Sequence, residues 1–285
     1  MRSVKTALAF AATLVAIPLS AQTWQAIGVP DRTDTGPYWN QPSDDFVGAA
    51  GVCHIGGILT NAPVPPSSCI NQSPRFLPLT PAPLTPQNLF LGGPGGSNPG
   101  AFRFAAGTYN INLIGRVASD VSTSWGVVLD NGTVFTAAQL AGGNTVLSGP
   151  FAIFISQALP AAGAGTIYTS TQSTGAVAIG SRGATINQQF AVFTNGTGLG
   201  ALGGLTTDAF GTIINSTNPN ARYYVGMEDN VNGGRGFGVA APGRESDRDY
   251  NDIIISIQSV PEPATFALMG FGLLALAGMA KRRKV

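Results

Sequence analysis

Short runs of β-branched and aromatic residues, separated by glycine-rich turns, make up most of the chain beyond Gly100. The runs cover residues 102–105, 109–117, 125–129, 134–136, 151–155, 166–171, 190–194, 223–227 and 253–257. Before the C-terminal tail, no segment shows the spacing of apolar side chains that is typical of an amphipathic helix. Many short strands with frequent turns are typical of two-sheet folds. The sequence therefore predicts an all-β domain over residues 101–259, a β-sandwich or a jelly roll.

One turn can be predicted in more detail. Asp130-Asn131-Gly132 lies between the runs at 125–129 and 134–136. Because Asn-Gly accepts positive φ at both central positions of a tight turn, the segment predicts a β-hairpin.

Residues 22–100 have a different composition. Thirteen of the twenty prolines lie between Trp24 and Gly100. Because proline is excluded from helix interiors and central strands, we expect extended loops and edge strands here. A disordered linker is the alternative, although Trp24, Tyr38 and Trp39 argue against it.

The N-terminus has the pattern of a secretory signal peptide. Arg2 and Lys5 precede an apolar run at residues 7–17, and Pro18 and Ala21 follow. The apolar run is shorter than the roughly 20 residues that span a bilayer. We therefore interpret residues 1–21 as a signal peptide that is cleaved after Ala21, the alternative being a buried N-terminal helix.

The C-terminus, residues 260–285, has three consecutive parts. Val260, Pro261, Glu262 and Pro263 are followed by an apolar stretch at residues 264–280, and then by Lys281, Arg282, Arg283 and Lys284. A helix of this length measures about 25 Å, enough for a thin membrane. The basic cluster should remain in the cytoplasm, which places the preceding domain outside the cell membrane. The sequence thus predicts a single transmembrane helix; a C-terminal core helix is the alternative.

This tripartite tail resembles the PEP-CTERM sorting signal of Gram-negative bacteria that produce exopolysaccharide. The resemblance implies that an exosortase, a membrane protease, recognises the tail and cuts near Pro261-Glu262-Pro263. It also implies transient anchoring in the inner membrane, followed by transfer to the cell surface or the extracellular space.

Export determines what to expect of Cys53 and Cys69. In an oxidising compartment a disulfide is the default, and it would stabilise the fold by about 3 kcal/mol. The alternatives are a metal site that uses Cys53 and His54, or a thiol nucleophile. The chain's two cysteines and single histidine cannot complete a four-ligand zinc site by themselves.

The distribution of charged residues limits the kinds of partner that residues 22–260 can bind. All lysines lie in the two end segments, and residues 22–260 carry nine arginines against thirteen acidic residues, a net charge of −4. Nucleic acids and anionic membrane surfaces attract basic patches, so this composition argues against both.

Six of the fourteen acidic residues fall between positions 228 and 252. Oxygen donors at alternate positions suit Ca²⁺, and alternate residues of an extended segment project to the same side. The predicted ligands are Asp247, Asp249, Asn251, Asp252, Glu228 and Asp229. The segment is not an EF-hand, because Asp252 replaces the glycine at the sixth position and Gln258 replaces the glutamate at the twelfth. Alternatively, these side chains cap turns and pair with nearby arginines.

The same region resembles a domain of unknown function found in secreted bacterial proteins. The resemblance rests on Tyr224-Val225-Gly226-Met227-Glu228-Asp229 and on Asp247-Arg248-Asp249-Tyr250-Asn251-Asp252. Met227 departs from the aromatic residue that is common in that family. The resemblance implies a compact, calcium-associated β domain with no established activity.

These observations favour a non-catalytic protein of the cell surface or exopolysaccharide matrix, and no residue is assigned a catalytic role. The first alternative is a carbohydrate-binding or adhesive module, in which exposed tryptophans and tyrosines would stack on sugars. The second is a secreted glycoside hydrolase that uses two carboxylates. The sequence contains neither a G-x-S-x-G nor an H-E-x-x-H motif.

Overall fold

The computed structural model of the chain describes residues 22–29, 37–39, 54–60, 82–97, 99–116, 124–157, 166–171, 177–179, 184–186, 189–196, 204–216, 218, 220–228 and 250–260. Two large β-sheets dominate these residues, and a small hairpin joins β10 (Val177–Ile179) to β11 (Ala184–Ile186). The predicted all-β class is confirmed.

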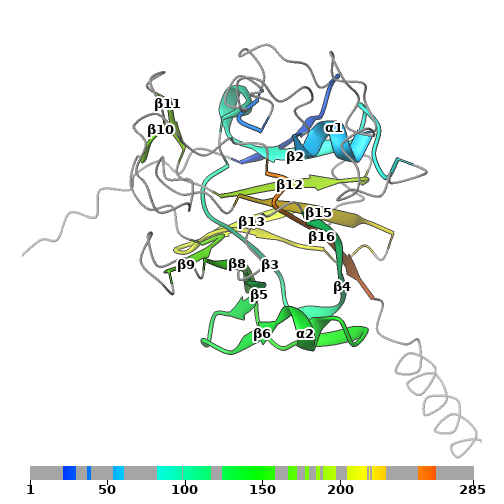
Figure 1. Cartoon of the computed structure of the whole chain (residues 1–285), viewed down its shortest axis with the longest axis vertical. Helices are drawn as coiled ribbons and strands as arrows, with labels where there is room; N and C mark the ends of the chain where they lie inside the picture. The colour runs from blue at the N-terminus through cyan, green and yellow to red at the C-terminus, as the bar shows by residue number, and fades with distance from the viewer. Residues whose placement is uncertain are drawn as a thin grey trace, which may run out of the picture.

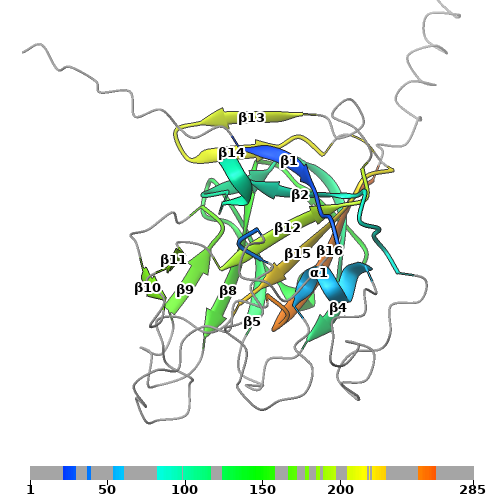
Figure 2. The ribbon, with the colours of Figure 1, turned by 90° about the horizontal axis from the view of Figure 1, so that it is seen from above.

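The first sheet contains seven strands in the order β1-β2-β12-β15-β16-β4-β7, and every neighbouring pair is antiparallel. The strands span Thr23–Ala26 (β1), Leu89–Gly92 (β2), Phe190–Thr194 (β12), Arg222–Met227 (β15), Ile253–Ser259 (β16), Gly107–Arg116 (β4) and Asn144–Leu147 (β7). Figure 2 shows β1, β2, β12, β15 and β16 side by side. Strands β1 and β2, from the proline-rich region, form one edge of this sheet.

The second sheet has the order β13-β14-β3-β8-β5-β6, and β9 pairs with β8 beside this path. Its strands span Leu205–Asp208 (β13), Gly211–Ile214 (β14), Phe102–Phe104 (β3), Phe151–Gln157 (β8), Ser124–Leu129 (β5), Val134–Thr136 (β6) and Thr166–Thr169 (β9). Ser170 follows β9 and joins two neighbouring strands. Its hydroxyl donates to the carbonyl of Phe102 at 2.8 Å and accepts from the N–H of Ile153 at 3.1 Å.

The predicted hairpin joins β5 to β6, and its loop has three residues rather than a two-residue turn. The N–H of Leu129 donates to the carbonyl of Thr133, and the N–H of Gly132 donates to the carbonyl of Leu129. Within this fully described loop, only Gly132 has a positive φ, at 84°. A β-turn followed by a glycine in the left-handed region is a common three-residue hairpin loop.

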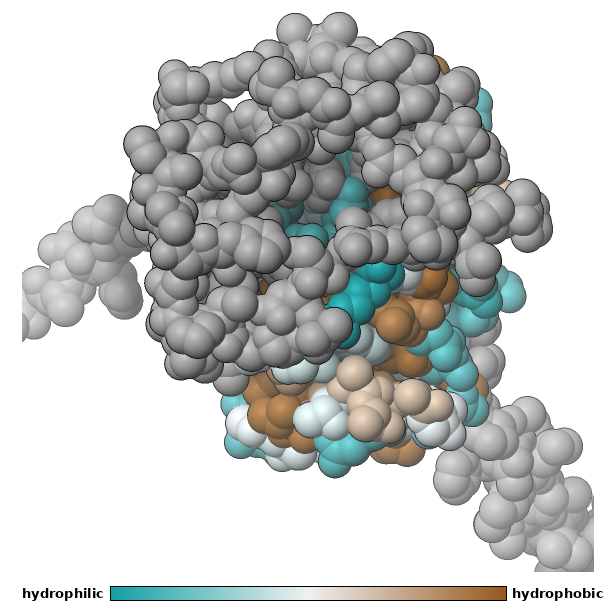
Figure 3. Space-filling model, in the orientation of Figure 1, coloured by the Kyte–Doolittle hydropathy of each residue, from teal (hydrophilic) through white to brown (hydrophobic). Residues whose placement is uncertain are grey.

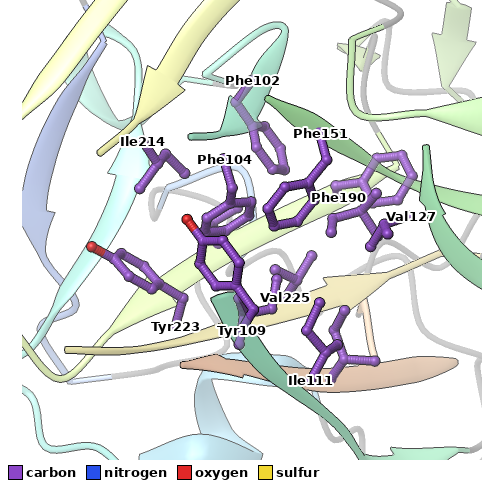
Figure 4. Packing of buried hydrophobic residues seen from close by; sticks show 14 of the residues in the cluster. Phe102, Phe104, Tyr109, Ile111, Val127, Phe151, Phe190, Ile214, Tyr223 and Val225 are labelled. Atoms are coloured by element: carbon purple, nitrogen blue, oxygen red, sulfur yellow. The ribbon is translucent and has the colours of Figure 1, made fainter. Parts of the chain in front are cut away.

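The main core lies between the two sheets (Figure 4). On β15, Tyr223, Val225 and Met227 face this core, as alternation along a strand requires. Aromatic residues of the second sheet meet them: Phe104 lies 5.4 Å from the ring of Tyr223 and 5.4 Å from that of Phe151. A short helix, α2 (Ala137–Leu140), closes one side of this core with Leu140.

The opposite face of the first sheet is also covered. Helix α1 (Ile55–Thr60) lies on this outer side, as both ribbon views show (Figures 1 and 2). A second group of buried residues, here called the outer cluster, consists of Ile27, Tyr38, Trp39, Ile55, Ile58, Leu59, Leu84, Phe90, Ala191, Phe193, Tyr224, Tyr250 and Ile254. The sequence predicts loops and edge strands here rather than α1, because the six residues of the helix, Ile-Gly-Gly-Ile-Leu-Thr, contain no polar face to mark a helical period.

Candidate functional site

The two parts of the acidic segment meet at one end of the first sheet. Strands β15 and β16 are antiparallel neighbours, and Met227 lies opposite Ile253. Glu228 directly follows Met227, and Asp252 directly precedes Ile253, so the two acidic residues occupy neighbouring positions where the strands end. Glu228 is buried, and Asp252 is half-buried.

The glycine and the tyrosine of the proposed family motif contact one another. A Cβ atom added at Gly226 would lie 2.4 Å from the carbonyl oxygen of Tyr250 and 2.2 Å from Cδ1 of Ile55. Tyr250 is the single non-glycine residue in the described part of the chain with a positive φ, at 53°. Its buried ring packs edge-on against Tyr38 at 5.7 Å. Close packing therefore accounts for Gly226 and Tyr250, whatever the neighbouring acidic residues bind.

Three of the six predicted calcium ligands can be placed. Glu228, Asn251 and Asp252 are described, whereas Asp229, Asp247 and Asp249 lie outside the described residues. Within the described residues, no group of three or more histidine, cysteine, aspartate and glutamate side chains could hold a metal ion. The calcium site therefore stays a prediction. Cys53 and Cys69 also lie outside the described residues, so their disulfide remains a prediction as well.

His54, the histidine of the alternative metal and triad hypotheses, begins a helix. Its Nδ1 accepts a hydrogen bond from the N–H of Gly57 at 3.2 Å, within the first turn of α1. The ring is buried and lies 5.7 Å from that of Trp39. Because the Nδ1 lone pair is already engaged, that nitrogen is not open for a metal ion.

Eight of the nine tryptophans and tyrosines, the residues expected to stack on sugars, lie in the two cores instead. All three tryptophans are buried, as are five tyrosines: Trp24, Trp39, Trp125, Tyr38, Tyr109, Tyr223, Tyr224 and Tyr250. They therefore offer no exposed ring to a ligand. Among the residues that the structure describes, the exposed large apolar ones come from different segments: Val29, Leu113, Val134, Val146 and Phe210. Figure 3 shows hydrophobic and hydrophilic residues interspersed on the described surface that faces the viewer.

A buried ion-pair cluster was not predicted from the sequence. Arg103, on β3, is fully buried, and its guanidinium donates hydrogen bonds to the carboxylates of Asp130 and Asp208. The guanidinium carbon also lies 5.3 Å from the centre of the Phe210 ring. Arg103 thus connects the β5–β6 loop to the end of β13. The carboxylates lie 27 and 105 positions away in the sequence, so no local pattern indicates this cluster.

The last described residue belongs to the predicted sorting segment. The N–H of Val260 donates to the carbonyl of Thr108 on β4 at 2.8 Å. Pro261, Glu262, Pro263 and the basic cluster at 281–284 lie outside the described residues, as do the signal peptide and the apolar stretch. Within the described part of the chain, no helix is long and apolar enough to cross a membrane.

Comparison with known proteins identifies the C-terminal end. No curated protein and no solved structure matches the chain. Residues 259–284 match the family model of the PEP-CTERM protein-sorting motif. The predicted sorting signal is therefore confirmed, and it marks the chain as an exported protein that an exosortase recognises.

Proposed function

We propose that the protein is a non-catalytic component of the cell surface or the exopolysaccharide matrix, stabilised by calcium and delivered by its C-terminal sorting signal. The observation that carries this proposal is where the sorting motif begins. Strand β16 ends at Ser259, and the motif match starts at the same residue. Anchoring or cutting the chain beyond Val260 would leave every described strand in place. A folded β domain that ends where the sorting signal begins can be transported and processed at its tail without losing a strand.

Three polar side chains in the described interior support a non-catalytic role. His54 starts a helix, Ser170 joins two strands, and Arg103 connects the β5–β6 loop to the end of β13. Each of these groups makes hydrogen bonds that hold parts of the fold together. A hydrolase would instead need an acid and a base that face a substrate.

The sorting part of the proposal is tested by ending the chain after Val260. We expect the truncated protein to be exported but lost from the membrane and the cell surface, because the anchor and the exosortase motif are both missing. Fractionation of cells that have an exosortase, followed by immunoblotting, measures the distribution. Replacing Val29, which is exposed and far from the tail in sequence, with alanine provides the control. An unchanged distribution of the truncated chain would contradict the proposed route.

The proposed calcium site predicts that adding Ca²⁺ raises the melting temperature of the protein. A ligand at about 100 times its dissociation constant stabilises a fold by about 2.7 kcal/mol, which corresponds to roughly 5–10 °C for a domain of this size. We expect Asp247→Ala and Asp249→Ala to abolish the rise. Asp208→Asn, a carboxylate of the Arg103 cluster, should leave the rise unchanged. If calorimetry detects neither heat nor a shift in melting temperature for the unmutated chain, the carboxylates only cap turns and pair with arginines.

A further inference from the structure

Strand β16, which lies beside β4 in Figure 1, runs directly into the sorting motif. The motif match starts at Ser259, the last residue of β16. Ser259 lies opposite Tyr109 on β4, and Val260 extends this register by one step, because its N–H donates to the carbonyl of Thr108 at 2.8 Å. Ser259 and Val260, here called the strand end, therefore belong both to the sheet and to the matched motif.

The strand end is paired on one side. At Gln258 the strand still has a partner on each side, Arg222 of β15 and Asn110 of β4. The pairing with β15 ends at Gln258, so among the described strands only β4 holds the strand end. Both residues of the strand end are half-buried, whereas Ile257 is fully buried in the main core. Because terminal segments that bury little apolar surface open locally at low cost, the strand end can leave β4, and opening stops at Ile257.

Little chain separates the strand end from the predicted membrane stretch. The residues at positions 261–263 lie between Val260 and the apolar stretch that begins at Ala264. The chain from Val260 to Ala264 spans at most about 14 Å when fully extended. The headgroup layer of a bilayer takes up about 5–7 Å of this distance. The remainder, about 7–9 Å, is less than the diameter of one helix, about 10–12 Å, so a folded enzyme cannot close around this segment while the strand end is paired.

Release of the strand end makes room for an enzyme. It adds two residues, or about 7 Å of extended chain, so the gap widens to about 14–16 Å and can hold one helix or strand. It also changes the partner of the backbone. The N–H of Val260 is a single donor, so it can bind the carbonyl of Thr108 or an acceptor of the enzyme, but not both. Extended peptides are commonly bound through such main-chain hydrogen bonds.

We infer that the exosortase binds the strand end as part of its substrate, after Ser259 and Val260 have left β4. The sheet and the exosortase thus compete for the same two residues. The opening breaks hydrogen bonds only, and water binds the N–H of Val260 and the carbonyl of Thr108 until the enzyme takes their place. A cut beyond Val260 leaves the strand end on the domain, where it pairs with β4 again. The inference rests on the proposed function, because it requires a tail that is held in the membrane and cut there.

A disulfide that locks the strand end to β4 tests the inference. Opposite residues that exchange hydrogen bonds have Cα atoms about 5.5 Å apart, which a disulfide can span, so Thr108→Cys with Val260→Cys provides the lock. The full-length variant in detergent is oxidised, freed of oxidant and mixed with membranes that contain an exosortase, and immunoblotting follows the cut. We expect the oxidised variant to be cut at least about ten times more slowly than the same variant reduced, because the enzyme binds only the open fraction. The unmutated chain, taken through the same oxidation and reduction, should be cut equally fast in both states.

A spacer tests the same competition without new cysteines. Inserting Gly-Ser-Gly-Ser-Ser-Val after Val260 leaves the strand end in the sheet and supplies a second Ser-Val before Pro261. We expect this variant to be cut about five times faster, a factor that corresponds to the net contribution of one backbone hydrogen bond. The same insertion after Gly142, in an exposed turn before β7, is the matched control and should leave the rate unchanged. With the spacer present, oxidation of the Thr108→Cys and Val260→Cys pair should no longer slow the cut.

Two results would overturn the inference. They are equal rates for the oxidised and reduced disulfide variant, and a spacer variant that is cut no faster than the unmutated chain. Either result would mean that the exosortase recognises the chain from Pro261 onward while β16 stays paired, and it would leave the proposed route intact. If the unmutated chain is not cut at all, the proposed route fails, and this inference fails with it.

Discussion

Replacing Trp39 with alanine is expected to lower the free energy of unfolding by about 3–5 kcal/mol, because it removes a large side chain from a closed apolar site. Trp39 is fully buried in the outer cluster. Its ring lies 5.5 Å from that of Phe90 on β2 and 5.1 Å from that of Phe193 on β12. A Cβ atom added at Gly56 of α1 would lie 2.1 Å from the indole. The indole thus fills the space between the helix and the sheet.

Thermal unfolding, monitored by circular dichroism, measures the effect of Trp39→Ala. The substitution should lower the melting temperature by about 10 °C for a domain of this size. Val29→Ala provides a control in the same proline-rich region, because Val29 is 75% exposed and its truncation should change stability by less than about 0.5 kcal/mol. Equal stabilities for Trp39→Ala and Val29→Ala would show that the proline-rich region does not stabilise the sheet.

The second large effect concerns the Arg103 cluster. The double substitution Asp130→Asn and Asp208→Asn should destabilise the protein by about 3 kcal/mol, because it leaves a buried guanidinium without a counter-charge. The substitution Arg103→Met should destabilise the protein much less. The side chains of Asp130 and Asp208 are 40% and 42% accessible, whereas that of Arg103 is 1% accessible. Water can therefore solvate the two carboxylates once the arginine is gone, but it cannot reach the guanidinium once the carboxylates are neutral.

The same cluster predicts a loss of stability in acid. Desolvation alone would raise the pKa of Asp208, but hydrogen bonds from the N–H of Phe210 and from Arg103, together with the positive charge of Arg103, lower it below its ordinary value. A carboxylate with a lowered pKa in the folded state stabilises the protein above its unfolded pKa of about 3.9, and this contribution disappears as the pH falls through the folded pKa. The free energy of unfolding of the double variant should therefore fall less steeply as the pH is lowered.

Urea unfolding at neutral pH and in acid separates these effects. Arg103→Met, Asp208→Asn and the double variant should be compared with the unmutated chain at constant ionic strength. If Arg103→Met is as destabilising as the double variant, packing around the arginine stabilises the fold more than charge balance does.

Of the candidate site, the sequence indicated the residue types but not their arrangement. Gly226 and Tyr250 belong to the motif shared with the domain of unknown function, yet their contact depends on how residue 250 enters β16. The acidic residues Glu228 and Asp252 become neighbours through antiparallel pairing. Only the strand register aligns four polar residues that are separated in the sequence: Arg222, Gln258, Asn110 and Asn144.

The sequence by itself determined the all-β class, the runs around β3, β4, β5, β6, β8, β9, β12, β15 and β16, the Asp130–Gly132 hairpin and the sorting signal. All of these depend on local chemistry, that is, on alternating side chains, turn residues or a contiguous motif. The tertiary structure alone decided that α1 and Trp39 cover the sheet, that Arg103 meets two distant carboxylates and that Arg222, Gln258, Asn110 and Asn144 lie side by side on four strands. These features depend on strand order and register, which bring residues up to 148 positions apart into one row, from Asn110 to Gln258.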